Sequence, residues 1–232
     1  MARGRNNGDK TFDMKKKYVL IAIRIMENEG FEAVNNRKVA KEAGCTSAVL
    51  YRHFDNKQDL MMTAAVKFLQ PYIKYLAQGY TRDDLNFIQI NLGNWKVFIE
   101  EAFNNKPCYD LFFSRGNDDS LYEYILEYYR LFPSELIEFD GYTGSITMNT
   151  DLRNRELIAL RRAANAGLIS MRNSDTLSRL SSTMFYGMFG LCPSNPGGNV
   201  DVKALKEECF NLIYELYSKY VNPDTDMSMD WY

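Results

Sequence analysis

The sequence is poor in the residues that most metal sites and many active sites require. Its 232 residues include one histidine, His53, and four cysteines, none of which form a C-x-x-C pair. Scattered cysteines are typical of small buried side chains in a reducing compartment rather than of a disulfide framework or a zinc site. No nucleophile with a base, glycine-rich phosphate loop or metal motif occurs at usable spacing. We therefore expect no enzyme active site, no metal and no cofactor.

Long hydrophobic runs are also absent. The longest candidate, Met184 to Pro193, is short and contains two glycines, so it does not match a membrane span. The amino-terminal residues MARGRNNGDK lack the apolar segment of a secretion signal. We expect a cytoplasmic protein without a membrane partner.

The charges are distributed unevenly, although the formal net charge is only −2. Residues 1–57 contain twelve Lys and Arg against seven Asp and Glu, whereas the remainder contains sixteen against twenty-three. A basic N-terminal part on an acidic body predicts a local surface that binds a polyanion.

Residues 35–54 contain two short amphipathic segments on either side of a glycine. In the first segment, Val39 and Ala43 fall on one apolar face of a 3.6-residue period. Gly44 can adopt the left-handed conformation that ends a helix. Thr46 can then cap the next helix.

In the second segment, Leu50 and Phe54 lie four residues apart and point inward together. The outer face is left to Ser47, Ala48, Val49, Tyr51, Arg52 and His53. This pattern predicts a helix-turn-helix, whose second helix suits insertion into the major groove of DNA.

Residues 18–60 resemble the DNA-binding domain of the TetR family of bacterial transcriptional regulators. The resemblance has fixed spacings without gaps and rests on Gly30, Phe31, Arg37, Val39, Ala40, Ala43, Gly44, Leu50, Tyr51, His53, Phe54, Lys57 and Leu60. The sequence departs from the family's pattern at four positions: at Asn36 an apolar residue is usual, at Lys38 an acid, at Cys45 a valine and at Val49 a threonine.

Lys57 follows Asn56, a good N-cap, in the first turn of the next predicted helix. A lysine there opposes the helix dipole, but it makes sense if a DNA phosphate binds at this end. The predicted DNA-binding residues are Arg37, Thr46, Ser47, Ala48, Val49, Tyr51, Arg52, His53 and Lys57. Because Ala48 and Val49 lack hydrogen-bond donors, affinity should depend mainly on phosphate contacts.

The apolar periodicity predicts an all-α chain. Beyond the helix-turn-helix, the predicted helices cover approximately residues 13–29, 57–78, 83–103, 108–114, 121–132, 150–165, 175–190 and 200–220, and residues 139–149 form a loop. We assign residues 1–56 to the DNA-binding domain, with a polar arm over residues 1–11. The resemblance implies that residues 57–222 form an effector-binding and dimerisation domain. Residues 223–232 form a frayed tail.

The last two predicted helices have wide apolar faces, and their glycines would allow close approach of another helix. They favour a homodimer through an intermolecular four-helix bundle, as the resemblance also implies. The candidate interface residues are Gly187, Gly190, Leu205, Leu212 and Leu216.

The middle helices are rich in aromatic residues, and the resemblance implies a small-molecule pocket among them. Its candidate residues are Phe68, Tyr72, Trp95, Phe98, Tyr109, Phe113, Tyr124, Tyr128 and Met184. These side chains favour an apolar or aromatic effector.

The resemblance thus implies a homodimeric repressor that binds a pseudo-palindromic operator in double-stranded DNA and releases it when a small effector binds. Two alternatives remain: a helix-turn-helix regulator that acts through a protein partner without a ligand, and an enzyme. A cavity of a few hundred Å³ would favour the sensor, whereas a fully packed middle domain would favour the partner model.

Overall fold

The computed structural model describes residues 5–79, 81–113, 120–137, 141–147, 149, 151–194 and 200–230. Within these ranges the regular secondary structure is helical, apart from an isolated antiparallel bridge between Ile169 and Val221. The predicted all-α class is confirmed. Across the same ranges, no helix is both long and apolar enough to cross a membrane.

The helices pack into two compact units, which are described separately. The first unit comprises residues 1–69 and 110–136, and the second comprises residues 70–109 and 137–232. This grouping reflects packing alone, so the functional boundary at residues 56 and 57 stays a prediction.

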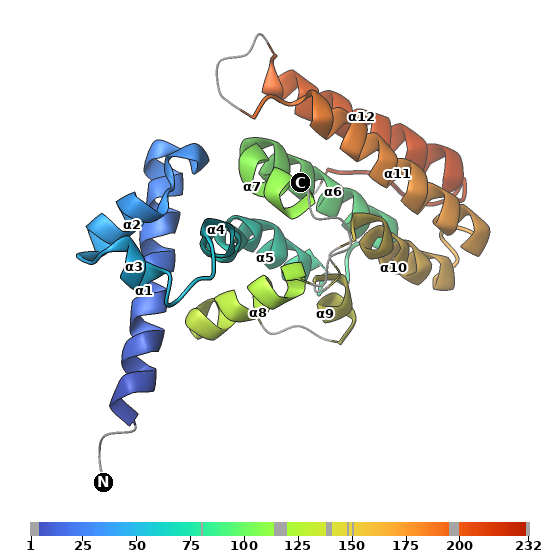
Figure 1. The fold of residues 1–232 in the computed structure, drawn as a ribbon. Helices are drawn as coiled ribbons and strands as arrows, with labels where there is room; N and C mark the ends of the chain where they lie inside the picture. Colours follow the sequence, from blue (N-terminus) through green and yellow to red (C-terminus); the bar gives the residue numbers. More distant parts are fainter. Residues whose placement is uncertain are drawn as a thin grey trace. The chain divides into compact units, whose positions relative to one another are not determined.

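The first unit contains the predicted helix-turn-helix (Figure 1). Its elements are α1 (Arg5–Glu29), η1 (Phe31–Ala33), α2 (Asn36–Ala43), α3 (Ser47–Leu50), α4 (Lys57–Ala65), η2 (Val66–Leu69), α8 (Ser120–Leu131) and η3 (Pro133–Glu135). Gly44 ends α2 with φ of 76°, in the left-handed region that only glycine adopts without strain. Asn35 caps α2 and Asn56 caps α4, each through its side-chain oxygen.

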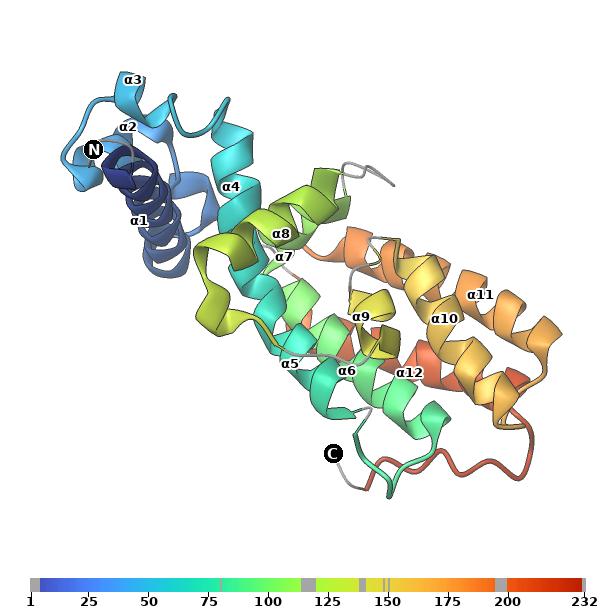
Figure 2. The ribbon, with the colours of Figure 1, turned by 90° about the horizontal axis from the view of Figure 1, so that it is seen from below.

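In this unit α1 packs on α2 and α4, and α8 packs on α4 (Figure 2). Lys15 of α1 forms an ion pair of 2.6 Å with Glu127 of α8. The Tyr124 hydroxyl donates a hydrogen bond of 2.5 Å to Oδ1 of Asp59 in α4. These contacts attach α8 to α1 and to α4, the helix that follows the helix-turn-helix.

The second unit is a helical bundle. It contains α5 (Gln70–Gly79), α6 (Phe87–Asn104), α9 (Gly141–Thr147), α10 (Leu152–Asn165), α11 (Met171–Leu191) and α12 (Val202–Tyr220), while α7 (Lys106–Phe113) spans the boundary between the units. Side-chain caps begin the helices at Asn86, Asp151, Ser170 and Asp201. Each cap accepts hydrogen bonds from backbone N–H groups that would otherwise lack partners.

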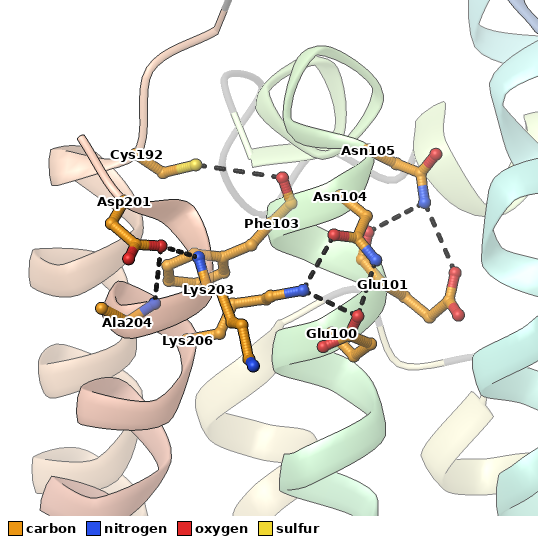
Figure 3. A network of polar contacts seen from close by, with 10 residues as sticks. All are labelled: Glu100, Glu101, Phe103, Asn104, Asn105, Cys192, Asp201, Lys203, Ala204 and Lys206. Atoms are coloured by element: carbon orange, nitrogen blue, oxygen red, sulfur yellow. Dashed lines mark hydrogen bonds and ion pairs between the residues drawn. The ribbon is translucent and has the colours of Figure 1, made fainter. Parts of the chain in front are cut away.

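Aromatic side chains form much of the core between α6 and α11. Phe98 packs against Phe185 with ring centroids 5.0 Å apart, and Phe103 packs edge-on against Phe189 at 5.6 Å. At the surface, Nζ of Lys206 on α12 bridges Glu100 (2.7 Å) and Asn104 (3.0 Å) on α6 (Figure 3). Apolar burial therefore provides most of the stabilisation, and exposed polar contacts add little.

The structure corrects four local predictions, of which the first concerns the N-terminus. Residues 5–11, predicted as part of a polar arm, are the start of α1, and residues 1–4 lie outside the described residues.

The second correction concerns the predicted continuous helix over residues 57–78, which is divided into α4, η2 and α5. Pro71 supplies the physical reason, because it has no N–H to donate to the carbonyl of Lys67.

The other two corrections lie in the second unit. Most of the predicted loop over residues 139–149 is α9, with residues 139, 140 and 148 outside the described residues. The C-terminal tail is not frayed over residues 223–230, because Asp226 accepts a hydrogen bond from Gln89 and Asn86 donates to its carbonyl oxygen. Residues 231–232 lie outside the described residues.

Candidate functional site

Two sites emerge, one in each unit, and the first is an open hollow beside the helix-turn-helix. It is lined by Asn35, Asn36, Arg37, Tyr51 and Lys57. Three of the nine predicted DNA-binding residues therefore meet at one place. Among these lining residues there are two cations and no carboxylate, so the hollow suits an anion.

Local helix geometry produces this convergence. Arg37 lies in the first turn of α2, Tyr51 follows α3, and Lys57 is the first residue of α4. Tyr51 is 51% exposed, whereas Leu50 and Phe54 are buried, as the four-residue spacing predicted. Free backbone N–H groups at the start of α4 add to the attraction for a phosphate beside Lys57.

The other predicted contacts are distributed around this hollow. Thr46 is at the N-cap position of α3 as expected, but its side chain makes no capping hydrogen bond, which corrects that prediction. Ala48 and Arg52 are exposed, and Ser47 and Val49 are partly buried. The helical segment is short, since α3 ends at Leu50 and the chain continues as a turn through residues 51–53.

His53 differs from the other predicted contacts because its ring packs edge-on against Tyr18, with centroids 5.3 Å apart. Burial, and then the charges of Lys15 and Arg52, lower the pKa of His53 below its ordinary value. The imidazole therefore remains uncharged at neutral pH. Positive charge for a phosphate must therefore come from its neighbours.

Two of the departures from the family's pattern, Lys38 and Asn36, have separate structural consequences. Lys38 forms an ion pair with Glu29, whereas an acid at this position could not. Asn36 is only 7% exposed, and among the described residues neither its side-chain oxygen nor its nitrogen has a hydrogen-bond partner. An unpartnered buried amide is destabilising.

The second site is an internal cavity of about 20 Å³ in the second unit, about the room that one water molecule occupies. It is lined by Tyr72, Leu76, Asn91, Asn94, Trp95, Phe98, Ile146, Leu152, Arg155, Glu156 and Ala159. Its volume is far below the few hundred Å³ that would favour a preformed effector pocket.

The predicted pocket residues divide between the two units. Tyr72, Trp95 and Phe98 line the cavity, and Tyr109 packs edge-on against Phe98 at 5.7 Å. Met184 is partly buried on α11 and is not a lining residue. The remaining four candidates belong to the first unit and do not line this cavity: Phe68, Phe113, Tyr124 and Tyr128.

A buried carboxylate is the main feature that the sequence interpretation missed. Oε1 of Glu156 accepts hydrogen bonds from Nε1 of Trp95, at 2.9 Å, and from the Tyr217 hydroxyl. Burial raises the pKa of Glu156 to about 7, although these hydrogen bonds oppose the rise. A signal was available, because Glu156 interrupts the apolar stripe formed by Leu152 and Leu160.

The predicted dimer residues also differ in exposure. Gly187 and Gly190 are exposed on α11, Leu212 and Leu216 are partly buried on α12, and Leu205 is buried within the protomer. A Cβ atom added at either glycine would meet nothing within 4 Å among the described residues. The glycine face is therefore open in the isolated chain.

Comparison with known sequences gives matches to bacterial regulators. Residues 21–62 match the model for "Bacterial regulatory proteins, tetR family". The nicotine-responsive transcriptional repressor HdnoR of Paenarthrobacter nicotinovorans is 33% identical over 64 residues, covering 28% of this chain and 33% of HdnoR. An HTH-type transcriptional regulator of Staphylococcus aureus strain USA300 is 29% identical over 129 residues, covering 50% of this chain and 65% of that protein. The chain thus spans less than two thirds of each of these relatives.

Solved structures share the fold across most of the chain. RolR in complex with resorcinol has a TM-score of 0.58 at 12% identity, covering 96% of this chain and 100% of RolR. SmeT, the repressor of the Stenotrophomonas maltophilia multidrug efflux pump SmeDEF, has a TM-score of 0.53 at 14% identity, covering 90% of this chain and 91% of SmeT.

The fold therefore defines a helix-turn-helix protein with a second helical unit. Residues 21–62 are similar to the DNA-binding domain of the TetR family of bacterial regulatory proteins, whose model they match.

The unpartnered amide of Asn36 gives a stability prediction. We expect Asn36→Leu to raise the free energy of unfolding by about 1–2 kcal/mol, because an apolar side chain of similar size removes the unpaired polar atoms. The control is Asn35→Ala, which deletes the side-chain acceptor of the Lys38 N–H. This substitution should lower the free energy of unfolding by about 1 kcal/mol. Urea denaturation measures both, and a destabilised Asn36→Leu would contradict the account.

The raised pKa of Glu156 predicts a dependence of stability on pH. Because the folded protein holds this proton more tightly than the unfolded chain, the stabilisation is complete below pH 4.5 and is lost as the pH rises through about 7. The shift corresponds to roughly 3 kcal/mol. Glu156→Gln should remove this dependence. In urea titrations, the stability of the variant relative to that of the natural protein should therefore rise as the pH increases from below 4.5 to 8. An unchanged difference would contradict the assignment.

Proposed function

We propose that the chain is a DNA-binding transcriptional regulator, a homodimeric repressor that a small-molecule effector releases from its operator. The observation that carries the proposal is the hollow in which Arg37, Tyr51 and Lys57 converge. The named functions of HdnoR and SmeT as repressors support the same reading.

In this proposal the hollow holds one phosphate of the DNA backbone. The Arg37 guanidinium, the Tyr51 hydroxyl and the Lys57 ammonium donate hydrogen bonds to its oxygens, and the start of α4 contributes backbone N–H groups. The exposed face around Ala48 and Arg52 then lies against the base edges in the major groove. Phosphate contacts position the domain, while the few polar groups on α3 limit direct reading of the sequence.

The dimer forms through α11 and α12 of two chains. Gly187 and Gly190 allow the two α11 helices to approach closely, and the partly buried Leu212 and Leu216 complete the apolar face. Two-fold symmetry would place two recognition segments about 34–36 Å apart, which is one turn of DNA.

Effector release requires coupling between the cavity in the second unit and the DNA-binding domain. RolR, a protein of similar fold, has been solved with resorcinol, which supports a ligand in the second unit here. Since the cavity holds about 20 Å³, it must expand for any effector to enter. Effector and DNA must lower each other's affinity by the same factor.

The phosphate assignment predicts a specific change in DNA binding. We expect Lys57→Ala and Arg37→Ala each to weaken binding about tenfold, the loss of one charge-assisted hydrogen bond, and each to reduce the salt slope by about one. Fluorescence anisotropy on a duplex selected from random sequences by the natural protein measures both effects.

The matched control is Lys74→Ala, which removes an equivalent exposed lysine from α5. It should leave both the affinity and the salt slope unchanged. Equal behaviour of the Lys57 and Lys74 variants would refute the phosphate site.

The dimer assignment predicts that Gly187→Glu produces monomers, because two like charges would face each other across the symmetry axis. The substitution should not disturb the protomer, where nothing lies within 4 Å of an added Cβ. Gly144→Glu on α9, another helical glycine with open surroundings, should remain dimeric. Light scattering after size-exclusion chromatography distinguishes these outcomes, and a dimeric, folded Gly187→Glu would exclude this interface.

A further inference from the structure

Arg155, which lines the cavity from α10, is a cation without a counter-ion. Its guanidinium carbon lies 4.8 Å from the centroid of the Tyr72 ring and 5.4 Å from that of Phe98. Its Nε is buried and has no hydrogen-bond partner, and none of the carboxylates in the described part of the chain forms an ion pair with it. A buried N–H group without a partner is costly, so this position favours an anionic group that would accept its hydrogen.

The neighbouring Glu156 does not neutralise this cation. Its Oε1 accepts hydrogen bonds from both Trp95 and Tyr217. Burial favours its protonated form, with a pKa of about 7. The titratable and charged groups that face it are Tyr72 of α5, Arg155 of α10 and Tyr217 of α12. Arg155 is therefore the one permanently charged group among the residues that line the cavity.

Three aromatic side chains also line the cavity, beside aliphatic residues and two asparagines. Tyr72 and Phe98 lie with centroids 4.9 Å apart, and Trp95 meets Phe98 edge-on at 6.0 Å. Such surfaces favour a flat, apolar body. The Arg155 guanidinium lies over two of these rings, so moving that one side chain would uncover them.

We propose that the cavity binds a small aromatic carboxylate. The ligand's ring replaces the Arg155 guanidinium against Tyr72 and Phe98, and the guanidinium turns to pair with the ligand's carboxylate. The inference rests on the proposed sensor function and names the chemistry of its effector.

The first test compares three probes that share one ring and differ in charge: benzoate, benzamide and benzylamine. Ligand-observed NMR titrations on the full chain should show saturable benzoate binding, at least tenfold weaker benzamide binding and the weakest binding for benzylamine. Equal affinities, a preference for benzylamine or no saturable benzoate binding would overturn the proposal.

Substitutions of two adjacent residues should change benzoate binding in opposite directions. Arg155→Met keeps the length of the side chain and removes its charge, so it should abolish the preference for benzoate over benzamide. Glu156→Gln keeps an acceptor for Trp95 and Tyr217 and removes the titrating negative charge, so benzoate should bind more tightly. The control Arg161→Met removes an exposed arginine that pairs with Asp175, and it should have no effect. A preference retained by Arg155→Met would contradict the proposal.

Benzoate binding is measured without DNA, and DNA affinity is then measured with and without benzoate. The carboxylate site and the sensor function can therefore fail separately. Benzoate that binds through Arg155 but leaves DNA affinity unchanged would uphold the carboxylate site and refute the sensor function. DNA binding without a benzoate preference would refute the carboxylate site and leave the regulator intact.

Discussion

The burial of Leu50 and Phe54 against α1 and α2 determines where the candidate DNA contacts lie. Both side chains are at most 4% exposed, and the residues between them have to turn outward. Tyr51 is thereby directed to the surface, and the chain reaches Asn56, whose side chain caps α4 and places Lys57 in its first turn. The placement of Tyr51 and Lys57 at the hollow thus follows from apolar packing a few residues away.

In the second unit, the buried carboxyl group of Glu156 connects the helices of the core. Glu156 brings together Trp95 of α6 and Tyr217 of α12 through one carboxylate oxygen. Removing a group of this kind from water is expensive unless its hydrogen bonds are complete. The same arrangement leaves Arg155 beside the cavity without a counter-ion, which is the basis for expecting an anionic effector. Structure and ligand chemistry therefore depend on the same pair of adjacent residues.

Local patterns were sufficient to predict the all-α fold, the helix-turn-helix and the cap at Asn56, because each depends on residues within one or two helical turns. The division between α4 and α5 was missed although Pro71 was a local signal for it. The helix α9 could not be predicted from a segment with two glycines, since packing against α5 and α10 stabilises it.

The site was less predictable than the fold, because the contacts that form it connect residues far apart in the sequence. Aromatic content could not indicate that Tyr124 would donate to Asp59 in the first unit while Tyr72 and Trp95 lined the cavity in the second. Glu156 and its partner Trp95 are 61 positions apart. The interruption of an apolar stripe could have identified Glu156, but not the residues that bind it.

The central claim is that the hollow formed by Arg37, Tyr51 and Lys57 binds one phosphate of the DNA backbone. It can be tested by replacing single phosphates of a bound duplex with neutral methylphosphonates, one position at a time, and measuring the affinities of the natural protein and of Lys57→Ala. The account predicts one position in each half-site where the replacement weakens the natural protein but has little further effect on Lys57→Ala, because both changes remove the same contact. Additive losses at every position would contradict the claim.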